Sequence, residues 1–302
     1  MKLNRLPILA LAVAILAGSG CSSDDYNYGD KGYATLSFAL DADSGLNVGE
    51  ISRAEGDERT IAEALGVDSY QDPAAENFTI VLKDSYDEEV YNGALSSWDA
   101  TQKLPLGEYT VSAVYDKETV GFYGVENGGD PAFEGAATFS VVEAKEYAVE
   151  IPVKLSNAIF KVVYTDMFRN YFKAADVKAK SQGLEPEVSF GYHDDDGDDV
   201  NAKVEPTEQG AFMMANSATI SYSFTPSQAQ GANANAVTGS LTQSLDPRTC
   251  YTLTFDVENV GGVKKFTITL NENNLVTEDL GEIDLNDDQY KDNGSDNGET
   301  NN

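Results

Sequence analysis

A single histidine limits the catalytic chemistry available to this chain of 302 residues. His193 stands directly before an acidic run that starts at Asp194 and includes Asp196 and Asp198. A serine–histidine–acid triad would have to use this one histidine, and a metal site built on several histidines cannot form. Because the run reads as a solvated hairpin tip, we predict no catalytic residue and no enzymatic activity.

The same acidic run has the composition of a calcium-binding loop. Aligning Gly197 with the central glycine of an EF-hand loop puts Tyr192 at the first ligand position and Lys203 at the twelfth. Both positions should carry ligand oxygens, so the EF-hand interpretation fails. The alternating aspartates could still hold calcium weakly, and a solvated acidic turn is the favoured interpretation. We therefore predict no cofactor and no established metal site.

Three aromatic residues are candidates for stacking on a sugar ring. Trp98 is the sole tryptophan of the chain, and Tyr123 and Phe133 are the other two candidates. An aromatic face can stack on a sugar, but packing inside the protein is an equally good use of such a ring. The chain holds 51 acidic residues, and no pair among them is singled out for glycoside hydrolysis.

The N-terminus has the layout of a secretory signal peptide. Lys2 and Arg5 precede an almost wholly apolar run over residues 6–17, and small residues follow it. A membrane-spanning helix needs roughly 20 apolar residues, so this run is too short to span a bilayer by itself. We predict that residues 1–20 are a lipoprotein signal peptide that is removed on export.

Cys21, directly after this segment, is predicted to be lipidated. The preceding small residues resemble a lipobox, although Gly18 stands where an aliphatic residue is usual. Ordinary cleavage that leaves a free thiol is the alternative. Two or three acyl chains would anchor the protein stably. Residues 21–32 are then a flexible tether, and its Ser22-Ser23-Asp24-Asp25 resembles an export tag for the outer face of the outer membrane.

The charge and the second cysteine exclude other classes of protein. The formal net charge is −31 at pH 7, and a field of that sign repels nucleic acid, so no nucleic-acid partner is expected. If Cys21 is acylated, Cys250 cannot form an intramolecular disulfide. Its strand-like surroundings predict a small packed residue.

The elements that position these residues are predicted to be almost all strands. Apolar and polar residues alternate along many short segments, which is typical of half-buried strands. We predict an all-β protein of two tandem β-sandwich domains, residues 33–155 and 156–285, with a β-barrel as the alternative. Pro152 predicts an edge or a kink in its strand. Residues 286–302 are predicted to form a disordered acidic tail.

Two short helices interrupt this pattern. Thr60 and Glu63 have the spacing of a capping box, and Gly66 could end that helix. Early in the second domain, Asp166 is predicted to cap a helix that includes Phe168.

Several short motifs, in the same order, resemble a Bacteroidetes-type surface lipoprotein family of uncharacterised function. They are Phe78-Thr79-Ile80, the run over residues 104–113, and Pro131-Ala132-Phe133-Glu134-Gly135. That family is similar to the fimbrillins, which have two transthyretin-like β-sandwiches. The resemblance implies cleavage after an arginine, with Arg53 first and Arg59 second, and removal of the first strand. A strand of another subunit would then fill the groove.

These observations predict a lipid-anchored cell-surface protein that is structural or adhesive and fimbrillin-like. Its partners would be the membrane, through the anchor, and other fimbrial subunits, through strand exchange. The alternative is a surface lipoprotein that binds host or dietary glycans for nutrient capture. An ordinary exposed loop remains the alternative interpretation of the arginine-containing segment.

Overall fold

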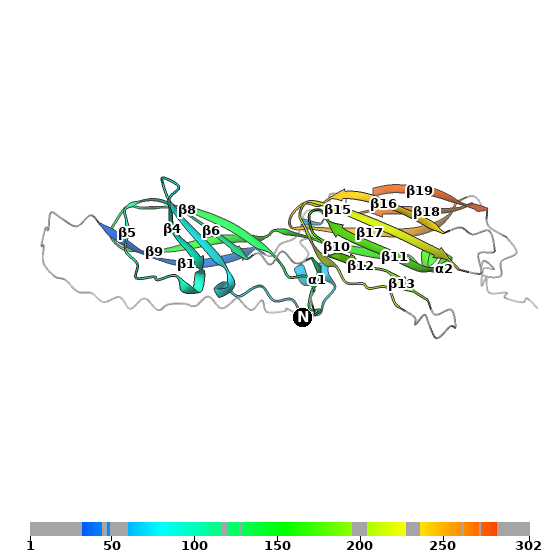
Figure 1. The fold of residues 1–302 in the computed structure, drawn as a ribbon, viewed down its shortest axis with the longest axis horizontal. Helices are drawn as coiled ribbons and strands as arrows, with labels where there is room; N and C mark the ends of the chain where they lie inside the picture. Colours follow the sequence, from blue (N-terminus) through cyan, green and yellow to red (C-terminus); the bar gives the residue numbers. More distant parts are fainter. Residues whose placement is uncertain are drawn as a thin grey trace, which may run out of the picture.

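The computed structural model describes residues 32–43, 47–48, 60–115, 120–126, 128–194, 204–227, 236–260, 263–271 and 273–282. Within these ranges most residues lie in strands, and the strands form three hydrogen-bonded sheets. The sheets make two elongated lobes that lie end to end (Figure 1). The prediction of an all-β protein is confirmed.

The N-terminal lobe consists of sheet 1, which has seven strands. Period-two alternation buries one side of each long strand, as in β6, where Tyr109, Val111, Ala113 and Tyr115 are buried. Across the sheet the strands are β4 (Glu89–Ala94), β3 (Thr79–Asp84), β6 (Gly107–Tyr115), β8 (Phe133–Val141), β9 (Glu146–Leu155), β1 (Tyr33–Asp43) and β5 (Leu104–Pro105).

Sheet 1 turns a corner between β8 and β9. Strand β8 pairs with β6 along its whole length but with β9 only from Phe133 to Gly135. A Cβ at Gly135 would clash with the carbonyl oxygen of Pro152, so glycine permits this close approach. Pro152 pairs on its other side with Asp41 of β1. The proline therefore lies where pairing with β8 ends, in agreement with the predicted edge.

The C-terminal lobe consists of sheets 2 and 3. Sheet 2 contains β19 (Asn273–Glu282), β18 (Val263–Leu270), β17 (Thr249–Val260), β10 (Asn157–Tyr164), β14 (Ala211–Met214) and β7 (Gly121–Phe122), with β2 (Asn47–Val48) paired to β17. Sheet 3 contains β12 (Glu187–Ser189), β11 (Phe172–Ser181), β15 (Ser217–Pro226) and β16 (Val237–Ser244), with β13 (Tyr192–His193) paired to β11.

Buried aromatic rings join sheets 2 and 3. The Phe224 ring of β15 lies 5.1 Å from the ring of Phe255 in β17 and 5.6 Å from that of Phe266 in β18, measured between centroids. Phe168 packs 4.9 Å from Phe224 in the same way. Such rings bury large apolar areas, so this cluster contributes strongly to the packing of sheet 2 against sheet 3.

The helices are short and are capped by local side chains. Helix α1 (Ile61–Leu65) has the predicted capping box between Thr60 and Glu63, and Gly66 ends it in the left-handed region at φ 67°. Helix α2 (Asp166–Tyr171) is also where it was predicted, but its N-cap is Thr165. The prediction of Asp166 as the cap is wrong, because the Thr165 hydroxyl accepts the Phe168 N–H. The 3-10 turns are η1 (Ala75–Asn77) and η2 (Leu95–Ser97).

Segments from the first half of the chain enter the second lobe. Strand β7 pairs with β14, β2 pairs with β17, and α1 lies between the lobes (Figure 1). The buried cluster of the N-terminal lobe also includes Ile159, Phe212 and Cys250 from sheet 2. The chain therefore passes between the lobes several times, into β2 and β7 as well as at Ser156, and buried side chains also pack across the junction. The exact domain limits stay a prediction.

Candidate functional site

Strand β1 forms the longest parallel ladder of the N-terminal lobe. Nine of its residues, Thr35 to Asp43, pair in register with Glu146 to Lys154 of β9. On its other side β1 pairs with β5 at Tyr33 and Ala34 only. Ala34 and Leu36 are buried in the core. Strand β1 is therefore hydrogen-bonded to β9 along one side, and alternate side chains of its first half pack into the core.

Trp98 holds β1 against the rest of sheet 1. Its indole Nε1–H donates a hydrogen bond of 2.9 Å to the carbonyl oxygen of Leu36. Its ring packs edge-on against Phe38 of β1, at 5.2 Å, and against Tyr91 of β4, at 5.0 Å. Because two ring contacts and the polar atom are used internally, Trp98 clamps β1, and its proposed role in stacking on a sugar stays a prediction.

The other two candidate stacking residues are also engaged. Phe133 is only 1% exposed and lies 6.4 Å from the Phe78 ring, so its ring is not an open surface for stacking, although the residue lines the cavity described below. Proposing it as a stacking residue was wrong, because its position in β8 faces the core. Tyr123 is half-buried and packs against Tyr70, at 5.2 Å, and Phe212, at 6.3 Å. The three residues do not form one aromatic platform.

The strand that follows β1 adds to sheet 2 at the start of β17, before the pairing of β17 with β18 begins. Asn47 and Val48 of β2 pair in parallel with Thr249 and Cys250 of β17. Cys250 is only 3% exposed, as its predicted packing role requires. The segment from β1 to β2 therefore runs from one lobe to the other, and its removal would uncover both ladders.

Several predicted site residues lie outside the described part of the chain. These are Cys21, Arg53, Arg59, Asp196 and Asp198.

The described residues on either side of the acidic run are joined by backbone hydrogen bonds. His193 pairs with Val204 through two backbone hydrogen bonds, and its Nδ1 lies 2.6 Å from the Asp194 carbonyl oxygen. In the part of the chain that the structure describes, no three potential metal-ligating side chains come together. In the same part, every helix is too short or too polar to cross a membrane.

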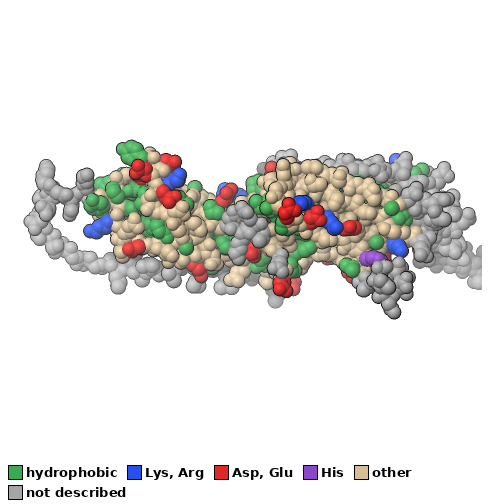
Figure 2. Space-filling view, viewed as in Figure 1, with side chains coloured by type: hydrophobic (Ala, Val, Ile, Leu, Met, Phe, Trp, Pro, Cys, Tyr) green, Lys and Arg blue, Asp and Glu red, His purple; other side chains and the backbone are tan. Residues whose placement is uncertain are grey.

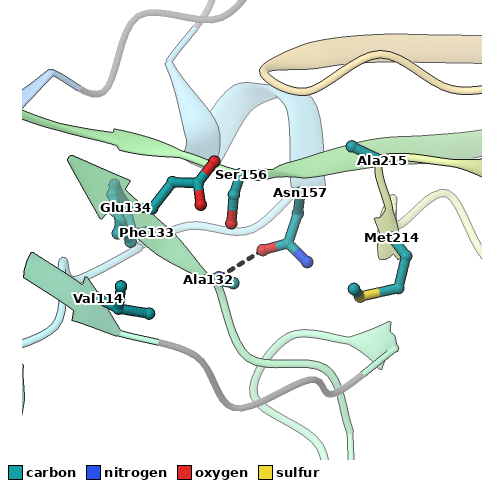
Figure 3. Close-up of a pocket in the computed structure, with 8 residues that line it drawn as sticks. All are labelled: Val114, Ala132, Phe133, Glu134, Ser156, Asn157, Met214 and Ala215. Atoms are coloured by element: carbon teal, nitrogen blue, oxygen red, sulfur yellow. Dashed lines mark hydrogen bonds between the residues drawn. The ribbon is translucent and has the colours of Figure 1, made fainter. Parts of the chain in front are cut away.

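A cavity of about 190 Å³ lies where the two lobes meet, and its lining residues are drawn in Figure 3. Asn157, only 1% exposed, accepts the backbone N–H of Ala132 through its side-chain oxygen. Its amide nitrogen points into the cavity (Figure 3). Glu134 and Ser156 supply a carboxylate and a hydroxyl. No local pattern in the sequence predicts this cavity, because its walls come from segments far apart in the chain.

Two buried polar groups lie close together in the segment that joins α1 to η1. The Tyr70 hydroxyl and Asp72 Oδ1 are buried, and neither has a partner in good hydrogen-bonding geometry. Burial raises the pKa of Asp72, and the neighbouring Tyr70 hydroxyl offsets only part of that rise. Burial, followed by the charge of Asp72, also raises the pKa of Tyr70. Burial therefore shifts the pKa of both groups toward retention of the proton.

Comparison with solved structures finds distant similarity over most of the chain. A proposed polysaccharide-binding protein of Bacteroides thetaiotaomicron is 11% identical, with a TM-score of 0.38 over 84% of this chain and 99% of the other. A proposed cell adhesion protein of Parabacteroides distasonis is 11% identical, with a TM-score of 0.37 over 82% and 98%. A proposed cell adhesion protein of Bacteroides eggerthii is 8% identical, with a TM-score of 0.37 over 82% and 97%.

No curated protein matches the sequence significantly. A family model described as "Domain of unknown function (DUF4493)" matches residues 35–286, which is most of the chain. The match begins inside β1 and extends beyond β19, so it includes both lobes. The expectation of an uncharacterised family is confirmed: the protein belongs to the DUF4493 family.

Proposed function

We propose that this protein is a lipid-anchored, non-enzymatic component of the cell surface, structural or adhesive in role, whose β1 strand is exchanged for a strand of another subunit. The observation that carries the proposal is the nine-residue parallel ladder between β1 and β9. A strand held in this way leaves a continuous groove when it departs. The groove would offer backbone hydrogen-bonding groups and apolar pockets, which are the two requirements for strand addition.

The order of segments along the chain suits such an exchange. The predicted anchor Cys21 precedes β1, and Arg53 lies in sequence between β2 and α1. A cut after Arg53 would leave β1 and β2 attached to the lipid. The remaining chain would then be held to them without a covalent bond, through the sheet ladders, the Trp98 clamp and the core packing of Ala34 and Leu36. Competition by another strand could release it from the anchor.

An arginine-specific protease tests this proposal on the purified precursor. Cleavage at Arg53 should produce higher oligomers on size-exclusion chromatography. It should also make Cys250 reactive toward a thiol reagent, because the loss of β2 leaves this end of β17 without a pairing partner on one side and easier to open. Arg53→Lys should block both effects. Arg59→Lys is the matched control, and it should change neither if Arg53 is the site.

A cleaved chain that stays monomeric, with Cys250 still protected, would contradict strand exchange. A precursor that resists the protease at both arginines would contradict the maturation step.

A second candidate function is glycan binding, and the cavity at the lobe junction favours it. A buried amide donor, a carboxylate and a hydroxyl beside apolar walls can bind the hydroxyl groups and carbon face of one sugar unit. Calorimetric titration with a panel of monosaccharides tests this function. Glu134→Gln should weaken any binding by about tenfold. The matched control Glu150→Gln, on exposed β9 surface, should have no effect.

A further inference from the structure

Four exposed apolar side chains mark the end of the N-terminal lobe that faces away from the junction. They are Tyr33 (44% exposed), Tyr86 (84%), Leu106 (44%) and Val142 (67%), and we call them the outer tip. They make up half of the large exposed hydrophobic side chains in the described residues. Figure 2 shows hydrophobic side chains at this end of the molecule.

The strand register brings these four residues to the same end of sheet 1. The pairs at that end are Tyr33 with Pro105, Gly107 with Val141, and Asp84 with Tyr109. A Cβ at Gly32 would lie 3.2 Å from Leu106 and 3.4 Å from Ala144. The start of β1 and three turns therefore lie at the same end of the sheet.

The turn that carries Tyr86 is held by its own side chains. Asp84 Oδ1 accepts the backbone N–H of Tyr86 at 2.9 Å and that of Glu88 at 3.0 Å. Lys83 Nζ donates to Asp87 Oδ1 at 2.8 Å. These bonds order the backbone of the turn, and the turn presents an aromatic ring that is almost fully exposed to solvent. A turn that is already ordered loses little backbone entropy on contact with another surface.

Tyrosine hydroxyls fix the other two turns. Tyr147 Oη accepts the backbone N–H groups of Val142, at 3.1 Å, and Glu143, at 3.0 Å. Tyr109 Oη donates to the Pro105 carbonyl at 2.8 Å, beside Leu106. The outer tip is thus a preorganised apolar surface.

We propose that the outer tip contacts the bilayer to which the protein is anchored. This inference rests on the lipid anchor at Cys21 in the proposed function. Ten residues lie between Cys21 and Gly32, so the eleven Cα–Cα steps place the tip at most about 40 Å from the anchor and on average about 20 Å away. The described chain begins at the tip, so the anchor holds this end near the lipid.

The composition of the outer tip matches the headgroup boundary of a bilayer. Tyrosine has an apolar ring and a polar hydroxyl, and it concentrates at membrane interfaces, while leucine and valine enter the adjoining hydrocarbon. Acidic side chains surround the tip: Asp84, Asp87, Glu88, Glu143 and Glu146. They outnumber Lys83 and Lys145, so the tip favours zwitterionic lipid over anionic lipid.

Quenching by brominated phosphatidylcholine tests the contact in the acylated mature protein, reconstituted into vesicles. Tyr86→Trp should lose at least about half of the emission that the new indole adds, because interfacial indoles lie within reach of bromine. The matched control is Val204→Trp, at an exposed apolar position (52%) in the C-terminal lobe. It should keep its added emission.

Vesicle flotation separates the failure of this inference from the failure of the anchor. Flotation with no quenching at position 86 would overturn the membrane contact and leave the anchor intact. A wild-type protein that does not float would overturn both.

Combined Leu106→Ser and Val142→Ser changes, made in Tyr86→Trp, should restore emission. Replacing part of the lipid with phosphatidylglycerol at low salt should also reduce the quenching, and quenching that increases would contradict the assigned lipid preference.

Discussion

Trp98 shows how the environment of one residue decides its role. Its ring and its N–H are both used to hold β1, through Phe38 and the Leu36 carbonyl. A lone tryptophan in the sequence is equally compatible with sugar stacking and with packing. Only the neighbours supplied by the fold distinguish the two uses.

Replacing Trp98 with phenylalanine should lower the free energy of unfolding by about 1–3 kcal/mol. The change keeps an aromatic ring but leaves the Leu36 carbonyl without its indole donor and leaves part of the packing space empty. Urea denaturation measures the change. Tyr86→Phe, at a residue 84% exposed, is the control and should have almost no effect. Equal stability of Trp98→Phe and wild type would show that the clamp is unimportant.

Asp72 should make stability depend on pH in the acid-to-neutral range. Burial raises its folded pKa above the unfolded value, so the folded state holds the proton more tightly. Stability is then greatest with Asp72 protonated, and falls as pH rises from the usual aspartate range through the raised pKa. Asp72→Asn should remove this decline and raise stability at neutral pH by about 1 kcal/mol or less, since the group is partly solvated. Thermal unfolding at several pH values measures the difference, and an unchanged profile would contradict it.

At the scale of elements, β1 is held by a long ladder on one side and by core side chains. Its alternating pattern predicted a strand, but gave no information on its partner. The parallel pairing with β9 joins residues more than a hundred positions apart in the chain. Such pairing depends on closing a large loop, which local propensity does not encode.

Leu36→Ala should lower the free energy of unfolding by about 2–5 kcal/mol, because Leu36 is fully buried and the space would not collapse completely. It should also speed release of β1 after cleavage at Arg53, measured by the rate of Cys250 labelling. Ala39→Ser, at an exposed position of the same strand, is the control. If Leu36→Ala lowers the free energy of unfolding but does not speed the labelling of Cys250, the core packing of Leu36 does not limit the release of β1.

At the scale of the whole molecule, the two lobes share structure at their junction. The Gly210 N–H donates to the Leu65 carbonyl of α1 at 2.9 Å, and one buried cluster includes residues from both lobes. Strands β2 and β7 add pairing between the two halves of the chain. These contacts should make the lobes unfold together.

Gly210→Ala should weaken this coupling. A Cβ there would lie 2.7 Å from the Ala64 carbonyl oxygen and 2.9 Å from Ile159, so α1 must shift. We expect a loss of about 1–3 kcal/mol and separation of one calorimetric transition into two. Gly107→Ala, where a Cβ meets only ordinary contact, is the control. Two separate transitions in the wild type would contradict coupled unfolding.

The sequence by itself determined the local features of this protein. Alternation predicted the strands, and the spacing of Thr60, Glu63 and Gly66 predicted α1 with its two caps, because these signals act within a few residues. The tertiary structure alone decided that Trp98 clamps β1, that Phe133 is buried, and that separate turns form one apolar tip. These outcomes depend on which distant strands pair and how the sheet turns at Gly135, and only the complete set of long-range contacts selects them.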